Sequence, residues 1–131
     1  MFLKLIQIIT MNDQNTTGNQ ELIKAAYAAF NIRDADGAIK FMDPEVKWAR
    51  AWEGDYASGP EDVKAYWERQ WKEIQATVIP VGFGTKEDGR LIVEVDQLAK
   101  DLEGNILFEG KVTHIHDIPD GLIKQMDIEK H

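Results

Sequence analysis

Between Leu22 and Trp71 the chain reads LIKAAYAAFNIRDADGAIKFMDPEVKWARAWEGDYASGPEDVKAYWERQW. Apolar residues recur at helical spacing in its first part, the polar residues 31–36 interrupt this pattern, and a shorter apolar pattern follows. Asp43-Pro44 ends the second pattern, because a residue that precedes proline is disfavoured in the helical region. The two predicted helices carry Leu22, Ile23, Ala26, Tyr27 and Phe30, and then Ile39, Phe41 and Met42.

A short strand and a third helix are predicted next. Residues 46–50 alternate in polarity, which predicts a strand with Val46, Trp48 and Arg50 on its inner face. Pro60 and the two acidic residues after it suit the first turn of a helix. One face of this helix is wide and aromatic, and it consists of Val63, Tyr66, Trp67, Gln70, Trp71 and Ile74.

The second half of the chain is typical of β-structure. Its apolar stretches are separated by short breaks that contain glycine, and such breaks indicate hairpins. Helices followed by hairpin strands predict an α+β fold, in which three N-terminal helices pack in a curved antiparallel sheet. The predicted strands are residues 77–84, 91–102, 106–118 and 122–128, and residues 52–58 are interpreted as a loop.

The composition limits the class of protein. At 131 residues the chain is long enough to bury a core as one domain, which we place at residues 20–131. The absence of cysteine excludes disulfides and thiol chemistry, and it is compatible with a reducing cytoplasm, where we expect the protein. A formal charge of −8 disfavours nucleic acids and anionic membranes as partners, because both attract basic patches.

Residues 1–19 are interpreted as an N-terminal extension of this domain. The apolar run within it is too short for a membrane-spanning helix and lacks the features of a secretory signal. Two interpretations stay open. Either the extension is disordered or not native before Met11, or an apolar helical stripe packs on the domain or on a partner subunit. That stripe would consist of Phe2, Leu5, Ile6 and Ile9.

Together these elements resemble the nuclear transport factor 2-like superfamily, in its SnoaL-like and ketosteroid isomerase-like branch. The resemblance covers residues 20–131 and rests on four short motifs. They are Tyr27-Ala-Ala-Phe30, the short helix after Asp36, Pro44-Glu-Val46-Lys-Trp48, and Gly59 followed by Tyr66-Trp67. The resemblance implies a cystatin-like cone with an internal cavity that binds a small molecule, and a homodimer that forms through the sheet.

The resemblance also implies positions for catalytic groups. Counting back from Gly59 places Arg50 where the ketosteroid isomerases carry a general-base aspartate. Ala26 stands where they carry an oxyanion-hole tyrosine, and Tyr27 is one residue further on. A proton shuttle at an enol needs a carboxylate base near the carbon and an acid near the oxygen. We therefore do not expect ketosteroid isomerase activity.

The register of the strand 106–118 decides whether two histidines reach the cavity. If Val112 points inward, His114 and His116 do so as well, because side chains alternate along a strand with a period of two. His114 then falls on the position of the second oxyanion-hole acid in the resembling family. In the opposite register both histidines face solvent or a partner subunit. We favour the inward register.

Arg50 and His114 are the candidate catalytic residues. In the inward register they face each other across the cavity. Arg50 would bind a carboxylate, phosphate or enolate there, and its charge would keep His114 neutral and able to act as a base. In the structural alternative, Arg50 forms ion pairs with Glu53, Asp55 or Asp96 at the rim, and His114 only makes a hydrogen bond.

The other candidate residues surround the predicted cavity. Trp52 and Tyr56 lie in the predicted loop, where large aromatic side chains suggest a lid or a dimer contact. His114 and His116 could share a metal ion, but the spacing marks no third ligand, so we predict no metal and no cofactor. The predicted ligand-binding residues are Tyr27, Trp48, Trp52, Tyr66, Trp67, His116 and Met126.

Three functions are consistent with these residues. The first is a cofactor-free lyase, isomerase or cyclase that acts on a small, partly apolar, anionic or enolisable molecule. In it His114 is the acid or base, and Arg50 stabilises the oxyanion. The second is a non-catalytic module that holds a small hydrophobic ligand. The third is a structural dimer without an accessible cavity.

Overall fold

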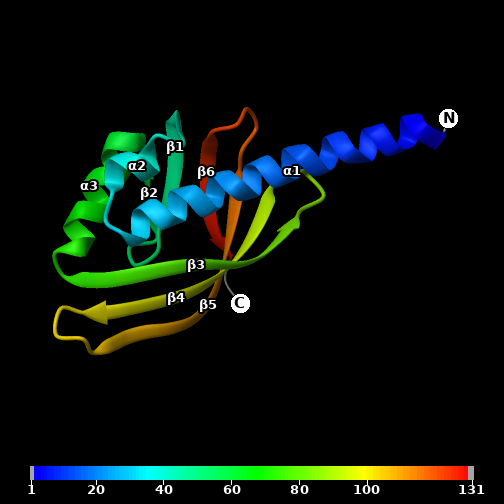
Figure 1. The fold of residues 1–131 in the computed structure, drawn as a ribbon. Helices are drawn as coiled ribbons and strands as arrows, with labels where there is room; N and C mark the ends of the chain where they lie inside the picture. Colours follow the sequence, from blue (N-terminus) through cyan, green and yellow to red (C-terminus); the bar gives the residue numbers. More distant parts are fainter. Residues whose placement is uncertain (1, 130–131) are drawn as a thin grey trace.

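The computed structural model describes residues 2–129, and the side chains of residues 17–129. Its helices lie over one face of a strongly curved sheet (Figure 1). The helices are α1 (Phe2–Asn31), α2 (Ala35–Ile39) and α3 (Pro60–Trp71). The strands are β1 (Met42–Arg50), β2 (Asp55–Ser58), β3 (Ile74–Thr85), β4 (Leu91–Asp101), β5 (Ile106–Asp117) and β6 (Ile123–Glu129).

Caps and backbone geometry set the ends of the helices. After α1, Arg33 adopts a left-handed conformation with φ 65°, and its guanidinium donates to the carbonyl of Ala76 over 2.6 Å, which ties this end of α1 to β3. The carboxylate of Asp34 caps α2 by accepting the N–H of Gly37 over 2.9 Å. Before α3, Gly59 has a φ of 87°, a conformation that favours glycine.

The six strands form one mixed sheet in the order β2-β1-β6-β5-β4-β3. The consecutive strands β3 to β6 pair antiparallel through hairpins, as the glycine-bearing breaks predict. β1 pairs antiparallel with β2 but parallel with β6. The α+β fold with three helices and a curved sheet is thus confirmed, whereas the sheet is mixed, because β1 and β6 are not joined by a hairpin.

The core lies between α1, α3 and the inner face of the sheet. Ile23, Val63, Val93, Val95 and Ile123 have no exposed surface, so every layer of the fold contributes to this core. Burial of this apolar surface is the main favourable term in folding. Aromatic rings fill the space between α1, β1 and α3, with edge contacts or stacking among Phe30, Trp48, Trp67 and Trp71.

Three element boundaries differ from the prediction. The predicted second helix carries Met42, but Met42 begins β1, where it pairs with Ile123. Ile74, predicted on the third helix, begins β3 and pairs with Asp101. The predicted loop 52–58 contains β2, which pairs with the end of β1. In the first two cases pairing with a strand distant in sequence overrides the local pattern, and in the third the short β2 pairs with the strand that precedes it.

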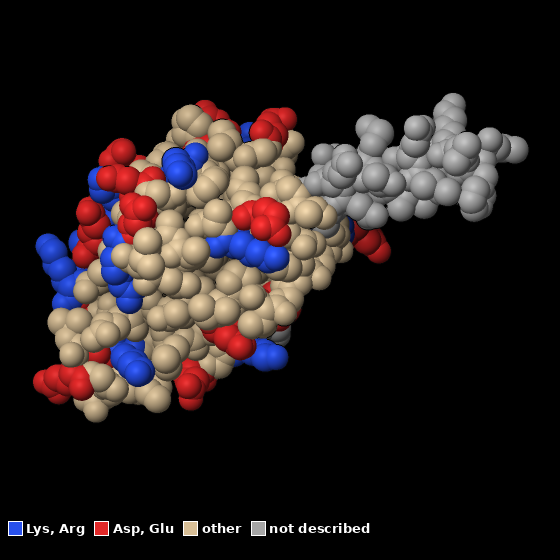
Figure 2. All heavy atoms as spheres, viewed as in Figure 1, with Lys and Arg blue, Asp and Glu red and all other residues tan. Residues whose placement is uncertain are grey.

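Residues 2–19 of the predicted N-terminal extension lie within α1, which begins at Phe2. The proposed apolar stripe of this extension falls outside the residues whose side chains are described. Among the described residues, no helix has both the length and the apolar character that crossing a lipid bilayer requires. On the face of the molecule seen in Figure 2, basic and acidic side chains of the described residues are interspersed.

Candidate functional site

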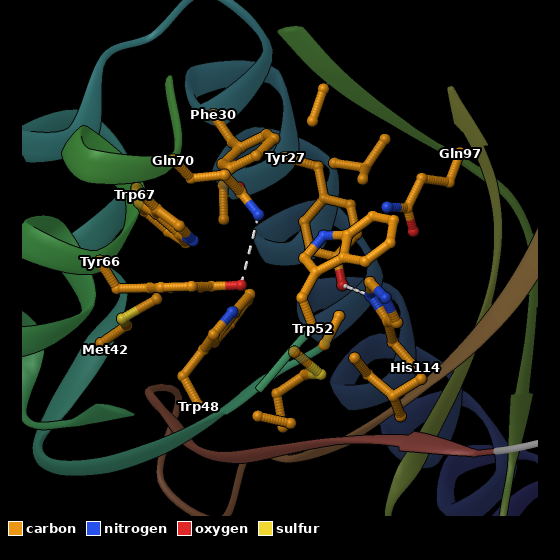
Figure 3. A pocket seen from close by; sticks show the side chains of 17 residues that line it. Tyr27, Phe30, Met42, Trp48, Trp52, Tyr66, Trp67, Gln70, Gln97 and His114 are labelled. Carbon is orange, nitrogen blue, oxygen red and sulfur yellow. Dashed lines mark hydrogen bonds between the residues drawn. The ribbon is translucent and has the colours of Figure 1, made fainter. Parts of the chain in front are cut away.

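An internal cavity of about 70 Å³ lies between the helices and the sheet. Its wall is mostly apolar, and the aromatic part comes from α1, β1, α3 and the turn after β1, with Tyr27, Phe30, Trp48, Trp52, Tyr66 and Trp67 (Figure 3). None of the 17 described residues that line it is Asp, Glu, Lys or Arg. The cavity is therefore apolar with a few hydrogen-bonding groups, as small-molecule sites commonly are.

Three polar side chains meet at one end of this cavity. The Tyr27 hydroxyl lies 2.6 Å from Nδ1 of His114 and 2.7 Å from Nε2 of His116. All three residues are buried, and His116 has no exposed surface. We call Tyr27, His114 and His116 the buried cluster. Of the three, Tyr27 and His114 line the cavity, and His116 lies behind them.

The buried cluster arises from two periodic elements. Tyr27 lies on the inner face of α1, one turn before Phe30. On β5, His114 pairs with Val93 of β4 and Ile128 of β6, and His116 pairs with Leu91 and Met126. The structure thus has the register in which both histidines face the helices.

Burial keeps all three members of the cluster uncharged. It lowers the pKa of His114 to about 4 and lowers the pKa of His116 well below its usual value, with a further contribution from His114. It also raises the pKa of the Tyr27 hydroxyl well above its usual value. His114 is therefore neutral at pH 7, but the cause is loss of solvent and not the charge of Arg50.

Arg50 belongs to a different cluster, at the rim of the sheet. Its guanidinium donates two hydrogen bonds of 2.6 Å to the carboxylate of Asp55, which is its cross-strand neighbour on β2. It also forms a 2.8 Å ion pair with Glu53. We call Arg50, Glu53 and Asp55 the rim cluster. Arg50 is not a wall residue of the cavity, but its guanidinium lies 5.7 Å from the ring of Tyr66, which is one.

The predicted ligand-binding residues separate into two sets. Five aromatic residues of the prediction line the cavity, namely Tyr27, Trp48, Trp52, Tyr66 and Trp67, together with Met126. His116 does not line it, because Tyr27 and Trp48 pack against its ring.

Trp52 and Tyr56, which share the predicted loop, have different surroundings. Trp52 lies in the turn after β1 and lines the cavity although 56% of its surface is exposed. Tyr56 lies on β2, outside the cavity, and donates a hydrogen bond to Asp127.

Two glutamines are wall residues that the sequence analysis does not single out as ligand-binding. Gln97 lies on β4 in phase with the buried Val93 and Val95, so the same period of two that marks the core also points to it. Gln70 lies one helical turn after Tyr66 and donates a 3.3 Å hydrogen bond to its hydroxyl (Figure 3). Gln70 is part of the predicted helix face, so its place on the wall follows from that pattern.

A metal site at His114 and His116 would need at least one further ligand. No group of three or more His, Cys, Asp or Glu side chains among them is arranged to hold a metal ion. His114 and His116 instead direct one nitrogen each at the Tyr27 hydroxyl.

The fold agrees with that of similar proteins. The SnoaL-like domain family matches residues 23–126, which is most of the chain, and the protein therefore belongs to this family. The comparison with curated proteins gave no match.

Several solved structures share the fold. TerC, crystallised with polyporic acid, has a TM-score of 0.74 and 23% identity over 87% of this chain and 92% of its own. A candidate polyketide cyclase from Xanthomonas campestris pv. campestris has a TM-score of 0.76 and 18% identity over 89% and 93%. A nuclear transport factor 2-like protein of unknown function from Burkholderia pseudomallei has a TM-score of 0.74 and 19% identity over 87% and 91%. At these identities the likeness concerns the fold.

Proposed function

We propose that this protein binds a small, uncharged, partly apolar molecule in its cavity, with His114 as the hydrogen-bonding partner of the ligand. The observation that carries this proposal is the position of His114. Its Nδ1 is held by Tyr27, while the ring lines a largely apolar cavity. A few polar groups in an apolar cavity fix the orientation of a ligand, and the apolar wall supplies most of the affinity.

The absence of charge on the cavity wall favours a neutral ligand over an anion. The guanidinium of Arg50 is already paired with the carboxylates of Glu53 and Asp55. An anion in the cavity would lose its hydration without gaining a cationic partner among the wall residues, and burial of an unpaired charge is unfavourable. Of the substrates that the sequence suggests, an enolisable carbonyl compound therefore fits better than a carboxylate or phosphate.

The size of the cavity implies that a ligand must displace Trp52. A cavity of about 70 Å³ is smaller than the roughly 150 Å³ of an engineered apolar cavity that holds benzene. Trp52, Tyr66 and Gln70 also line an external groove of about 320 Å³. Movement of the half-exposed Trp52 side chain would join this groove to the cavity.

Catalysis is a second candidate function, and the neutrality of His114 favours it. A neutral imidazole can donate a hydrogen bond to a carbonyl oxygen and stabilise the negative charge that forms there when a base from solvent removes an α-proton. Cofactor-free isomerisation, elimination or cyclisation through an enol would need this step. TerC, which shares the fold, was crystallised with polyporic acid.

Binding can be measured with the tryptophans of the cavity wall as reporters. We expect cyclopentanone to change the intrinsic fluorescence of the protein in a saturable manner. His114→Ala should weaken this binding at least tenfold, because it removes the only imidazole among the described residues of the wall. Arg50→Gln is the matched control and should leave it unchanged. Binding that is insensitive to His114→Ala, or no binding of small cyclic ketones, would contradict the proposal.

Catalysis is tested separately by exchange of the α-hydrogens of cyclopentanone in D₂O. Faster exchange with the wild-type protein than with His114→Ala would show enolisation in the cavity. Binding without any faster exchange would reject the catalytic function and leave the binding function.

A further inference from the structure

The Tyr27 hydroxyl is shared between two imidazole rings through differently placed nitrogens. It contacts Nδ1 of His114 and Nε2 of His116. A hydroxyl has one proton, so it donates to one of these nitrogens and must accept an N–H from the other. Each neutral imidazole also carries a single N–H. The direction in which Tyr27 donates therefore fixes the tautomers of both rings together.

Only two arrangements satisfy both contacts. In the first, His116 donates from Nε2 to Tyr27, Tyr27 donates to Nδ1 of His114, and His114 carries its proton on Nε2. In the second, His114 donates from Nδ1, Tyr27 donates to Nε2 of His116, and His116 carries its proton on Nδ1. Both rings are thus Nε2–H tautomers in the first arrangement and Nδ1–H tautomers in the second.

The surroundings of His116 distinguish the two arrangements. Its Nδ1 is fully buried and has no hydrogen-bond partner among the described residues. The second arrangement would place an N–H at this atom, whereas the first leaves a lone pair there. Buried N–H groups without a partner are rarer in proteins than acceptors without one. The Nε2–H tautomer is also the one that the neutral imidazole of free histidine prefers.

We propose that Tyr27 and His116 are positioning residues, which hold His114 in its Nε2–H tautomer so that the cavity presents an N–H donor to its ligand. Nε2 of His114 has no hydrogen bond to the described residues. Unlike Nδ1 of His116, it is not fully buried. The inference rests on the proposed function and narrows the ligand class. The ligand carries an acceptor oxygen at the His114 end, as a ketone or another carbonyl compound does.

The same arrangement limits what His114 can do with its proton. If Nε2 gave its proton away completely, His114 could regain one through Nδ1 from Tyr27, and Tyr27 could regain one from Nε2 of His116. His116 would then be left as a buried imidazolate, which is a charged group without solvent. The buried cluster is therefore a fixed hydrogen-bond donor and not a store of protons. It would stabilise negative charge on a carbonyl oxygen without protonating it.

Nitrogen NMR of histidine-labelled protein tests the tautomers directly. The chain contains three histidines, so the signals can be assigned with His114→Gln and His116→Gln. We expect His114 and His116 each to show a protonated Nε2 and an unprotonated Nδ1. An unprotonated Nε2, or signals averaged between the two nitrogens, would overturn the proposal. In Tyr27→Phe the signals of His114 should become averaged. An unchanged His114 pattern there would show that Tyr27 does not position the ring.

A pair of isosteric probes tests the ligand class. Cyclopentanone and methylenecyclopentane have similar shapes, but only the ketone has an acceptor oxygen. We expect the ketone to bind at least tenfold more tightly, and this preference to shrink in Tyr27→Phe. Equal affinities would overturn the donor role. If neither probe binds while the NMR signals show Nε2–H on both rings, the tautomer assignment stands and the proposed binding function fails.

Discussion

The buried cluster and the rim cluster touch the same aromatic wall, but they accommodate polar groups in opposite ways. Tyr27 and the two histidines stay uncharged in a buried region, where the Tyr27 hydroxyl makes a hydrogen bond to one nitrogen of each imidazole. Arg50 stays charged at the edge of the sheet and shares its charge with two exposed carboxylates.

This difference indicates which cluster can recognise a ligand. A hydrogen bond is stronger in a medium of low dielectric constant, and each buried polar atom must find a partner. The rim cluster is exposed and internally paired, so a ligand would have to compete with both carboxylates and with water. The buried cluster has one imidazole edge on the cavity wall, so it can act on a ligand that excludes water.

The largest expected effect contrasts two tryptophans, one beside each cluster. Trp48, which is 8% exposed, packs on His116 and Trp67, whereas Trp52 is 56% exposed in the turn next to Arg50. We expect Trp48→Ala to lower the free energy of unfolding by roughly 3–5 kcal/mol, because it leaves a cavity in the core. Trp52→Ala should change it by only about 0.5 kcal/mol. Urea unfolding measures both changes. Similar losses of stability would mean that Trp48 is not packed more tightly than Trp52.

The second prediction concerns pH. The pKa of His114 is about 4 in the folded protein and close to 6.5 when the ring is in water, so the unfolded chain binds more protons between these values. The free energy of unfolding should therefore fall as the pH decreases from about 6.5 to about 4, by about 3 kcal/mol for His114 alone. His116, whose pKa is also lowered, should add to this loss.

The rim cluster supplies the control for this titration. The ion pair with Arg50 lowers the pKa of Asp55 below 3.8, so this carboxylate should lose its stabilising effect only at lower pH than the histidines. Asp55→Asn should therefore leave the urea midpoints between pH 4 and pH 6.5 on the wild-type curve, apart from a constant offset. If the urea midpoint of the wild type did not change with pH in this range, the imidazoles of His114 and His116 would be accessible to water.

Two tyrosines give a matched test of the hydrogen bonds in the two regions. Tyr27→Phe should cost about 2 kcal/mol, because it leaves two imidazole nitrogens buried without their partner. Tyr56, whose hydroxyl donates to Asp127, is half-exposed on β2. Tyr56→Phe should cost less than about 0.5 kcal/mol, because water can replace the lost partner. Equal costs in urea unfolding would contradict the assignment of the buried cluster to a dry environment.

The sequence predicts the fold well because its helices and most of its strands have clear apolar periods. It cannot decide the register of β5 by the same means. Thr113 and Ile115 on one face of the strand are as buried as His114 and His116 on the other, so no polar face marks the outside. The inward direction of the histidines becomes certain only through the contact with Tyr27, which is distant in sequence.

The position of Arg50 shows a second limit of the sequence. It follows Trp48 by two residues, so the period of two predicts that it lines the cavity. However, Arg50 is the last residue of β1, and its neighbour across the sheet is Asp55 at the start of β2. β2 has only four residues, Asp55–Ser58, without a run of apolar residues, so the sequence gives little sign of this partner.

The smallest expected effect is that of Arg50→Gln, which tests whether the rim cluster takes part in ligand recognition. Its ion pairs are solvent-exposed, and such pairs contribute little to stability on average. We therefore expect a urea midpoint close to that of the wild type and an unchanged affinity for cyclopentanone. Asp55→Asn removes the other member of this pair and leaves the guanidinium with Glu53 alone, so it should also leave this neutral probe unaffected. If Arg50→Gln weakened binding while Asp55→Asn strengthened it, the guanidinium would have to reach the ligand after Trp52 moves. The rim cluster would then be part of the site, with the two carboxylates competing with the ligand for Arg50.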